Sequence, residues 1–138
     1  MDQILSSPHR WPIALVGVGR LGEALLGHKA FKSSKFDIKV LFDVDPDKVG
    51  TPIAGIPCYH MDDIDQVMRE NGIEVVILTV PSLVAQECVD RIVAVGTVKG
   101  ILNFSPLAIV APDDVLVYSV DISVELEKLL FYLKHREE

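Results

Sequence analysis

Residues 13–22 read IALVGVGRLG, and this stretch decides the fold. The first four residues are apolar without a break, which is typical of a strand buried on both faces of a sheet. Three glycines follow with the spacing GxGxxG. Gly17 permits a tight turn out of the strand, Gly19 lets a ligand approach the backbone, and Gly22 allows the next helix to pack closely. The stretch therefore predicts a strand, a phosphate-binding turn and a helix.

An acidic residue supports a dinucleotide ligand for this turn. Asp43 ends the next predicted strand, 37–42, and lies twenty-one residues after Gly22, where a ribose-binding carboxylate is expected. A carboxylate at this position accepts hydrogen bonds from both ribose hydroxyls and repels a 2′-phosphate, which favours NAD(H) over NADP(H). The alternatives are a glycine-rich turn without a ligand and an ordinary acidic residue at a strand end.

The rest of the chain alternates between β-rich and helix-period segments. This alternation indicates an α/β fold with a Rossmann-like, doubly wound, mostly parallel sheet. We expect a lead-in segment over 1–12, a dinucleotide-binding domain over 13–122 and a C-terminal dimerisation helix over 123–138. Further strands are predicted at 56–59, 74–80, 100–104 and 115–120, and further helices at 63–71, 81–96 and 124–135. The helix at 81–96 is expected to turn Ala85, Cys88, Val89 and Ile92 inward.

The last predicted helix carries more apolar residues than one buried face needs. Ser123 is its expected N-cap. Leu126, Leu129, Leu130 and Leu133 form a single stripe, and aromatic residues lie beside it. A chain of 138 residues has little surface left to cover a second face. We interpret this helix as a dimer contact.

Two further segments follow strands at the edge of the sheet where ligands bind. Thr79-Val80-Pro81 ends one strand, and Asn103-Phe104-Ser105-Pro106 ends the next and is expected nearer the nicotinamide. Ordinary turn chemistry is an equally good explanation of both segments. The helix after the glycine turn is expected to place Leu21, Ala24, Leu25 and His28 on its inward face, and His28 is interpreted as a core residue rather than a ligand contact.

Composition narrows the function classes. The net charge is −7, with no cluster of Lys and Arg, so this chain alone is expected to bind DNA poorly. Cys58 and Cys88 are its two cysteines, which predicts reduced thiols in the cytoplasm and no metal site. No apolar run is long enough to span a membrane, and no secretory signal opens the sequence.

No catalytic residue is expected, because the Tyr-x-x-x-Lys dyad, the G-x-S-x-G elbow, HExxH and the P-loop are all absent.

Five segments together resemble the cofactor-binding domain of the Rex family of redox-sensing transcriptional repressors. The resemblance extends from about Trp11 to Lys134, and the segments following residue 100 are more specific to the family than the glycine turn. The segments are LVGVGRLG (15–22), FDVDP (42–46), ILTVP (77–81) with Ala85-Gln86, GILNFSP (100–106) and VDISVEL (120–126).

The resemblance implies a mechanism and completes the candidate site. Rex repressors are homodimers that leave operator DNA when the NADH/NAD⁺ ratio rises, with the C-terminal helix exchanged between subunits and the nicotinamide near the dimer interface. The resemblance also implies that Asp121 matches an acidic residue of the family that lies near the nicotinamide. The expected NAD(H)-binding residues are then Gly17, Val18, Gly19, Arg20, Leu21, Gly22, Asp43, Val44, Asp45, Thr79, Val80, Pro81, Asn103, Phe104, Ser105, Pro106 and Asp121.

The sequence departs from the family in two places. These 138 residues include no counterpart of the N-terminal winged-helix domain through which such repressors bind DNA, so we expect either a sensor domain cut from a longer protein or a stand-alone relative. In addition, His28 stands where the family often has tyrosine. The leading hypothesis is a homodimeric NADH/NAD⁺ sensor that carries out no reaction. A CoA-binding or nucleotide-binding domain is the alternative, and a minimal oxidoreductase, without its acid/base dyad, is the third.

Overall fold

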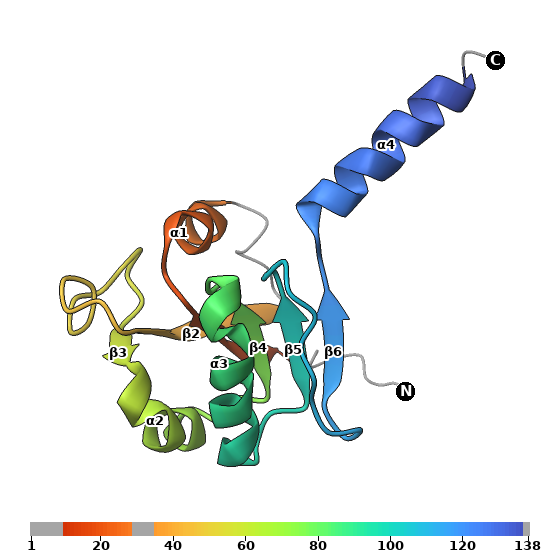
Figure 1. Cartoon of the computed structure of the whole chain (residues 1–138). Coiled ribbons are helices and arrows are strands. Elements are labelled where there is room, and N and C mark those ends of the chain that lie inside the picture. The colour runs from red at the N-terminus through yellow and green to blue at the C-terminus, as the bar shows by residue number, and fades with distance from the viewer. Residues whose placement is uncertain (1–9, 29–34, 137–138) are drawn as a thin grey trace.

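A single parallel sheet is the centre of the computed structural model, which describes residues 10–28 and 35–136 (Figure 1). Its six strands are arranged in the order β3-β2-β1-β4-β5-β6, and each pair of neighbours is parallel. The strand order changes direction between β1 and β4, and this is where ligands of doubly wound sheets bind. The strands are β1 (Trp11–Val16), β2 (Phe36–Asp43), β3 (Cys58–His60), β4 (Val75–Leu78), β5 (Gly100–Asn103) and β6 (Leu116–Ser119).

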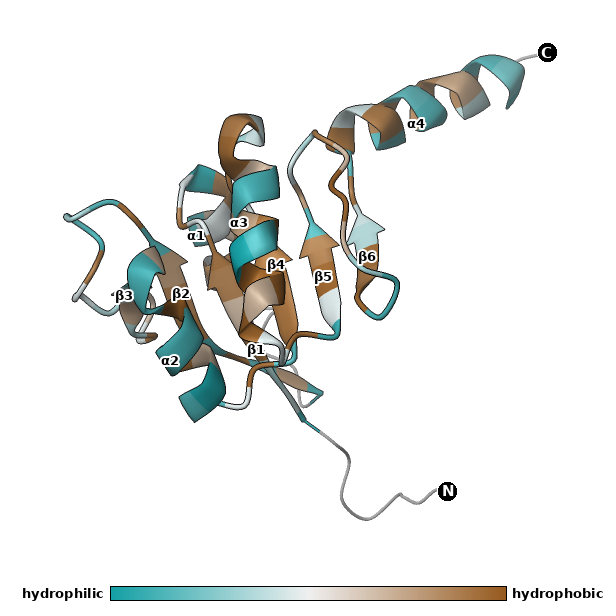
Figure 2. Ribbon diagram, turned by 60° about the horizontal axis from the view of Figure 1, so that its bottom comes forward, coloured by the Kyte–Doolittle hydropathy of each residue, from teal (hydrophilic) through white to brown (hydrophobic). Residues whose placement is uncertain are grey.

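Helices cover both faces of the sheet, as Figures 1 and 2 show. Helix α1 (Arg20–Gly27) covers one face. The other face is covered by α2 (Ile64–Glu70), preceded by the short 3₁₀ helix η2 (Met61–Asp63), and by α3 (Ser82–Val95). The predicted Rossmann-like, doubly wound fold is confirmed, with a sheet that is parallel throughout.

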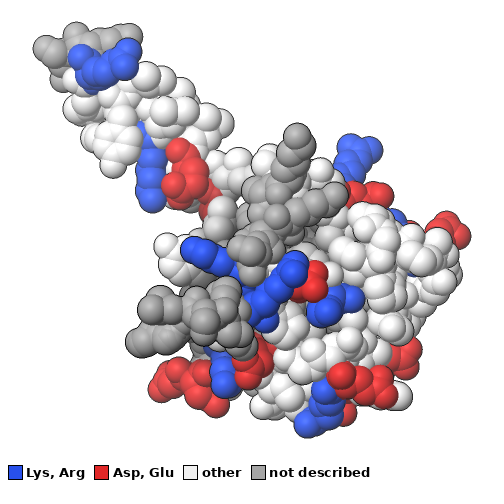
Figure 3. Space-filling model, turned by 180° about the vertical axis from the view of Figure 1, so that it is seen from behind, with Lys and Arg blue, Asp and Glu red and all other residues white. Residues whose placement is uncertain are grey.

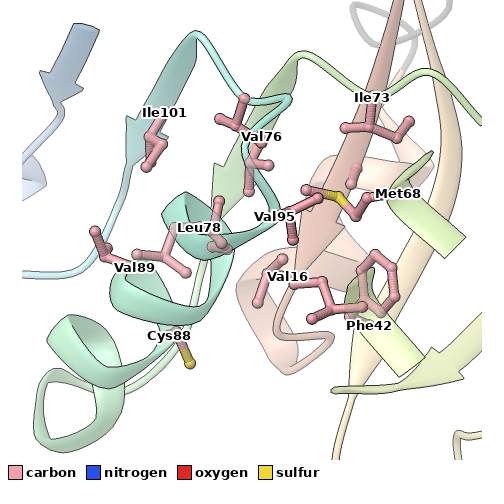
Figure 4. Packing of buried hydrophobic residues seen from close by; sticks show 14 of the residues in the cluster. Val16, Phe42, Met68, Ile73, Val76, Leu78, Cys88, Val89, Val95 and Ile101 are labelled. Carbon is pink, nitrogen blue, oxygen red and sulfur yellow. The ribbon is translucent and has the colours of Figure 1, made fainter. Parts of the chain in front are cut away.

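The alternation of side chains along the strands produces two apolar clusters. In β1, Ala14 and Val16 pack toward α2 and α3, while Ile13 and Leu15 pack toward α1. The cluster under α2 and α3 is the larger one, and part of it is shown in Figure 4. Phe42 is completely buried in it, at the end of β2. The larger cluster therefore packs against the carboxyl ends of β1, β2 and β4, which lie at or next to the change in strand order.

The buried face of α1 differs from the predicted one. Gly22 and Leu26 are buried against the sheet, whereas Ala24 is exposed, and His28 lies just beyond the helix and is also exposed. The reason is the close approach of Gly22 to the sheet, which turns the row containing Gly22 and Leu26 inward. The interpretation of His28 as a core residue was wrong.

Helix α4 (Ile122–Arg136) projects away from the sheet (Figure 1). None of its described side chains is buried. Its large apolar side chains are between 41% and 66% exposed. The N-cap is Asp121 rather than the predicted Ser123, because the carboxylate of Asp121 accepts hydrogen bonds from the backbone N–H groups of Ser123 and Val124 at 3.0 and 3.4 Å.

Candidate functional site

The three glycines of the first turn have three different structural environments. Gly17 has a φ of +93°, and a Cβ there would lie 2.6 Å from Val80 Cγ1. A Cβ on Gly22 would lie 2.7 Å from the carbonyl oxygen of Gly17. A Cβ on Gly19 would have no heavy atom of the described residues within 4 Å. Gly17 and Gly22 are therefore required by the fold, whereas the space above Gly19 is open to a ligand.

Helix α1 presents its amino end beside this open space. Gly19 is its N-cap, in an extended conformation, with no side chain to cap the first turn. The first N–H groups of a helix have no carbonyl four residues earlier to bind. They carry the positive end of the helix dipole and are suited to an anion such as a diphosphate. Arg20 and Leu21 belong to this turn.

The carboxylate of Asp43 is held by three backbone N–H groups. Its Oδ2 accepts a hydrogen bond from Val18 at 2.7 Å, and its Oδ1 accepts from Val44 at 2.7 Å and from Asp45 at 3.0 Å. Each carboxylate oxygen has two lone pairs, so Oδ1 is saturated and Oδ2 retains one acceptor position. In this arrangement Asp43 has room for one ribose hydroxyl, where the sequence predicted two.

Thr79 joins the glycine turn to the end of β4. Its backbone N–H donates to the carbonyl oxygen of Val16 at 2.9 Å. Its hydroxyl donates to the carbonyl oxygen of Gly17. The two strands that flank the change in strand order are therefore tied at their carboxyl ends, and the walls of the crevice are fixed relative to each other.

A cavity of about 530 Å³ lies at this place, on the side of the sheet covered by α2 and α3. Eight of the predicted residues line it, at the ends of β1, β2 and β4: Gly17, Val18, Gly19, Asp43, Val44, Thr79, Val80 and Pro81. The other eight lining residues were not among the predicted ones: Val16, Phe42, Lys48, Met61, Val84, Glu87, Cys88 and Arg91. Four of those are on α3, in i, i+4 pairs that follow Pro81, so helical spacing could have indicated them.

The cavity suits the adenosine half of a dinucleotide. It joins the open space above Gly19 to the acceptor of Asp43, so one ligand can reach both. Val44, Met61 and Val84 supply apolar surface for a flat base. Among the described residues, no group of three or more His, Cys, Asp and Glu side chains could hold a metal ion.

The second predicted segment, Asn103 to Pro106, lies outside this cavity. Asn103 is fully buried, and its amide group is used within the protein. It accepts from the N–H of Ser105 at 2.9 Å and donates to the carbonyl oxygen of Leu107 at 3.1 Å. Asn103 therefore shapes the turn that carries Phe104, a half-buried side chain packed against the α1-side cluster.

Asp121 lies at the junction between β6 and α4, also outside the cavity. The hydroxyl of Ser123 donates to its Oδ1 at 2.7 Å. This bond, with the backbone N–H groups of Val124 and Ser123, lowers the pKa of Asp121 below its ordinary value of 3.8. Asp121 is therefore a carboxylate at neutral pH and fixes the start of α4.

The two cysteines are buried and free. Burial raises the pKa of the Cys58 thiol and of the Cys88 thiol above the ordinary value of 9.0, and nearby acidic residues raise both further. Both side chains are therefore neutral thiols at pH 7, with low nucleophilicity. Cys88 contributes a small apolar surface to the cavity wall.

Comparison with known proteins agrees with this geometry. Residues 9–107 match the family model described as CoA binding domain. The chain is 47% identical over 134 residues to the protein named redox-sensing transcriptional repressor Rex of Listeria welshimeri serovar 6b, covering 97% of this chain and 62% of that protein. It therefore spans about three fifths of that relative's length.

Solved structures show the same similarity. The crystal structure of RSP, a Rex-family repressor, in complex with β-NADH superposes with a TM-score of 0.84 at 30% identity, covering 94% of this chain and 62% of that one. RSP in complex with β-NAD⁺ and operator DNA gives a TM-score of 0.84 at 30% identity, covering 94% and 59%. The expected resemblance to this family is confirmed.

Proposed function

Because this chain belongs to the CoA-binding domain family and resembles redox-sensing repressors over nearly its whole length, we propose that it is the NADH/NAD⁺-sensing domain of a Rex-type repressor. It binds the cofactor and carries out no reaction on it. The observation that carries the proposal is the open space above Gly19, between the amino end of α1 and the free acceptor of Asp43. Two RSP structures with NADH and NAD⁺ support the same ligand.

Each part of the site binds a different part of the cofactor. The first N–H groups of α1 hold the diphosphate, Asp43 accepts one hydroxyl of the adenosine ribose, and the cavity encloses the adenine. Asp43 also disfavours a ribose with a 2′- or 3′-phosphate, because two anions would then be in contact. This repulsion argues against NADP(H) and against CoA, whose ribose carries a 3′-phosphate.

The nicotinamide half extends toward the ends of β5 and β6. The turn from Phe104 to Pro106 and the junction at Asp121 form this part of the site, outside the cavity of the single chain. The nicotinamide ring carries a positive charge only when it is oxidised. Burial beside Phe104 therefore favours NADH, because moving a cation out of water costs free energy. A ligand that prefers one conformation of the dimer shifts the population toward it.

Helix α4 supplies the dimer contact. Its exposed apolar side chains lie on more than one side of the helix, and a second copy can cover them. Exchange of α4 between subunits places each Asp121 junction next to the partner's site. The ligand and the dimer are thereby coupled through one short segment.

DNA is bound through a separate domain of such a repressor rather than through this chain. In the rear view of Figure 3, Lys and Arg side chains of the described residues lie beside Asp and Glu side chains. The net charge of −7 repels a polyanion. Within the described part of the chain, no helix has both the length and the apolar character needed to cross a bilayer.

Isothermal titration calorimetry tests the proposal with three ligands. NADH is expected to bind more tightly than NAD⁺, and CoA is expected to bind weakly or not at all. The NADH absorbance should stay constant during the titration, since no reaction occurs. Equal affinities for NADH and NAD⁺ would reject the sensor, and tighter binding of CoA would favour the CoA-binding alternative.

A further inference from the structure

Lys48 lies at the edge of the proposed cofactor cavity, where its ammonium group contacts the glycine turn. Its Nζ donates a hydrogen bond to the carbonyl oxygen of Val18, the residue between Gly17 and Gly19. Its side chain is 26% exposed and lies 3.9 Å from the carboxylate of Glu23, in the first turn of α1. Lys48 is therefore attached to the turn that receives the diphosphate, although it lies thirty residues further along the chain.

Val18 is held at both of its backbone polar groups, by Asp43 at the end of β2 and by Lys48 in the turn that follows. Asp43 Oδ2 accepts from its N–H at 2.7 Å, and Lys48 donates to its carbonyl oxygen. The Val18 side chain is itself completely buried. The glycines on either side have no side chains to restrict the backbone, so these three contacts restrict it instead.

Local hydrogen bonds place Lys48 for this contact. The N–H groups of Lys48 and Val49 both donate to the carbonyl oxygen of Asp45, at 2.9 and 3.0 Å, which closes one helical turn after Asp45. Gly50, with a φ of +85°, ends that turn and donates to the carbonyl oxygen of Cys58 at 2.9 Å. These hydrogen bonds fix the backbone of the turn between β2 and β3, and with it the backbone of Lys48.

We propose that Lys48 is a positioning residue for NAD(H) binding, which holds the Val18 carbonyl so that the glycine turn is ordered before the diphosphate arrives. The inference rests on the proposed function and adds a residue that the glycine motif does not contain. A turn that is already ordered loses less conformational entropy when the ligand binds. A hydrogen bond from a charged donor is strong enough for its loss to weaken binding about tenfold.

A different role for Lys48 would be to neutralise Glu23, which otherwise repels the diphosphate. Glu23→Gln alone removes the ion pair and leaves the Val18 contact in place. The double variant Glu23→Gln/Lys48→Met separates the two roles, because removing Glu23 restores the affinity only if Lys48 acts by neutralising it. The variant Lys39→Met is the matched control for loss of a lysine. Lys39 is an exposed residue of β2, paired with Asp37 at 3.2 Å, and it does not line the cavity.

The experiment combines calorimetry with amide hydrogen exchange on the full chain. Lys48→Met should weaken NADH binding about tenfold and speed exchange of the Val18 amide in the free protein, while the amide of Ile77 in β4 is unchanged. Lys48→Arg, which keeps a charged donor, should restore most of the affinity. Glu23→Gln and Lys39→Met should bind NADH within about twofold of the unchanged protein.

The other results overturn the proposal. Unchanged affinity and unchanged Val18 exchange in Lys48→Met would show that Lys48 does not order the turn. Full recovery of NADH affinity when Glu23→Gln is added to Lys48→Met, without faster Val18 exchange in Lys48→Met, would assign Lys48 a purely electrostatic role. If the unchanged protein binds no NADH, the proposed function fails separately. Exchange at Val18 then decides alone whether Lys48 holds the turn.

Discussion

Gly19→Ala is expected to weaken cofactor binding without unfolding the protein. The added Cβ would meet no heavy atom of the described residues within 4 Å, and the φ of −89° at Gly19 suits alanine. The same methyl group would occupy the space above the amino end of α1. The diphosphate would then be held away from the N–H groups that it is proposed to contact.

The expected change in the free energy of unfolding is smaller than the expected change in the free energy of NADH binding. Alanine is a poorer N-cap than glycine by about 0.5–1 kcal/mol. It also restricts the unfolded chain, which returns about 0.4–1 kcal/mol of stability. The free energy of unfolding should therefore change by less than about 0.5 kcal/mol. Loss of one hydrogen bond to a charged phosphate costs about 1.5–3 kcal/mol, which corresponds to about 10- to 100-fold weaker NADH binding.

Urea denaturation and calorimetry measure the two quantities on the same samples. Gly27→Ala is the matched control, since a Cβ at Gly27 also meets no heavy atom of residues 10–28 and 35–136 within 4 Å and Gly27 lies at the far end of α1. This control should bind NADH normally. A folded Gly19→Ala variant that binds NADH within twofold of the unchanged protein would refute the assignment of the diphosphate site.

Four further variants test other parts of the account. Gly22→Ala places a Cβ 2.7 Å from the Gly17 carbonyl oxygen, so urea denaturation should show a loss of about 1–3 kcal/mol; normal stability would contradict the close packing. Asp43→Ala should weaken NADH binding at least about tenfold in calorimetry, because both the ribose acceptor and the anchor of the turn are lost. Leu130→Asp on α4 should convert the proposed dimer to a monomer in light scattering, and a dimer that persists in this variant would exclude α4 as the contact. The raised pKa of Cys88 means that its contribution to stability is complete below pH 9.0 and falls as the pH rises further, so Cys88→Ser should flatten the alkaline loss seen in urea denaturation.

The sequence predicted the fold because local patterns and topology agree. The glycine turn, the continuous apolar strand before it and the alternation of segments all require a parallel sheet. The predicted inward residues of α3 were also confirmed, with Ala85, Cys88, Val89 and Ile92 all buried. The face of α1 was not predicted correctly, because it depends on how closely Gly22 approaches the sheet and not on helical periodicity alone.

The residues that line the cavity were predicted from the sequence only where they follow strands directly. Residues such as Asp43 and Thr79 follow strands directly, so their position at the crevice is a consequence of topology. Lys48 and Arg91 reach the cavity from a turn and from a helix, and their approach is decided by tertiary packing. Asn103 shows the opposite case, because it ends a strand at the correct edge but its amide group is used to shape the next turn.

A crystal structure of this chain grown with NADH tests the central claim most directly. We expect the diphosphate to lie over Gly19 at the amino end of α1, one adenosine ribose hydroxyl to contact Asp43 Oδ2, and the adenine to fill the cavity between β2 and α3. The account is contradicted if NADH is bound elsewhere on the chain, or if the cavity stays empty at a saturating concentration of NADH.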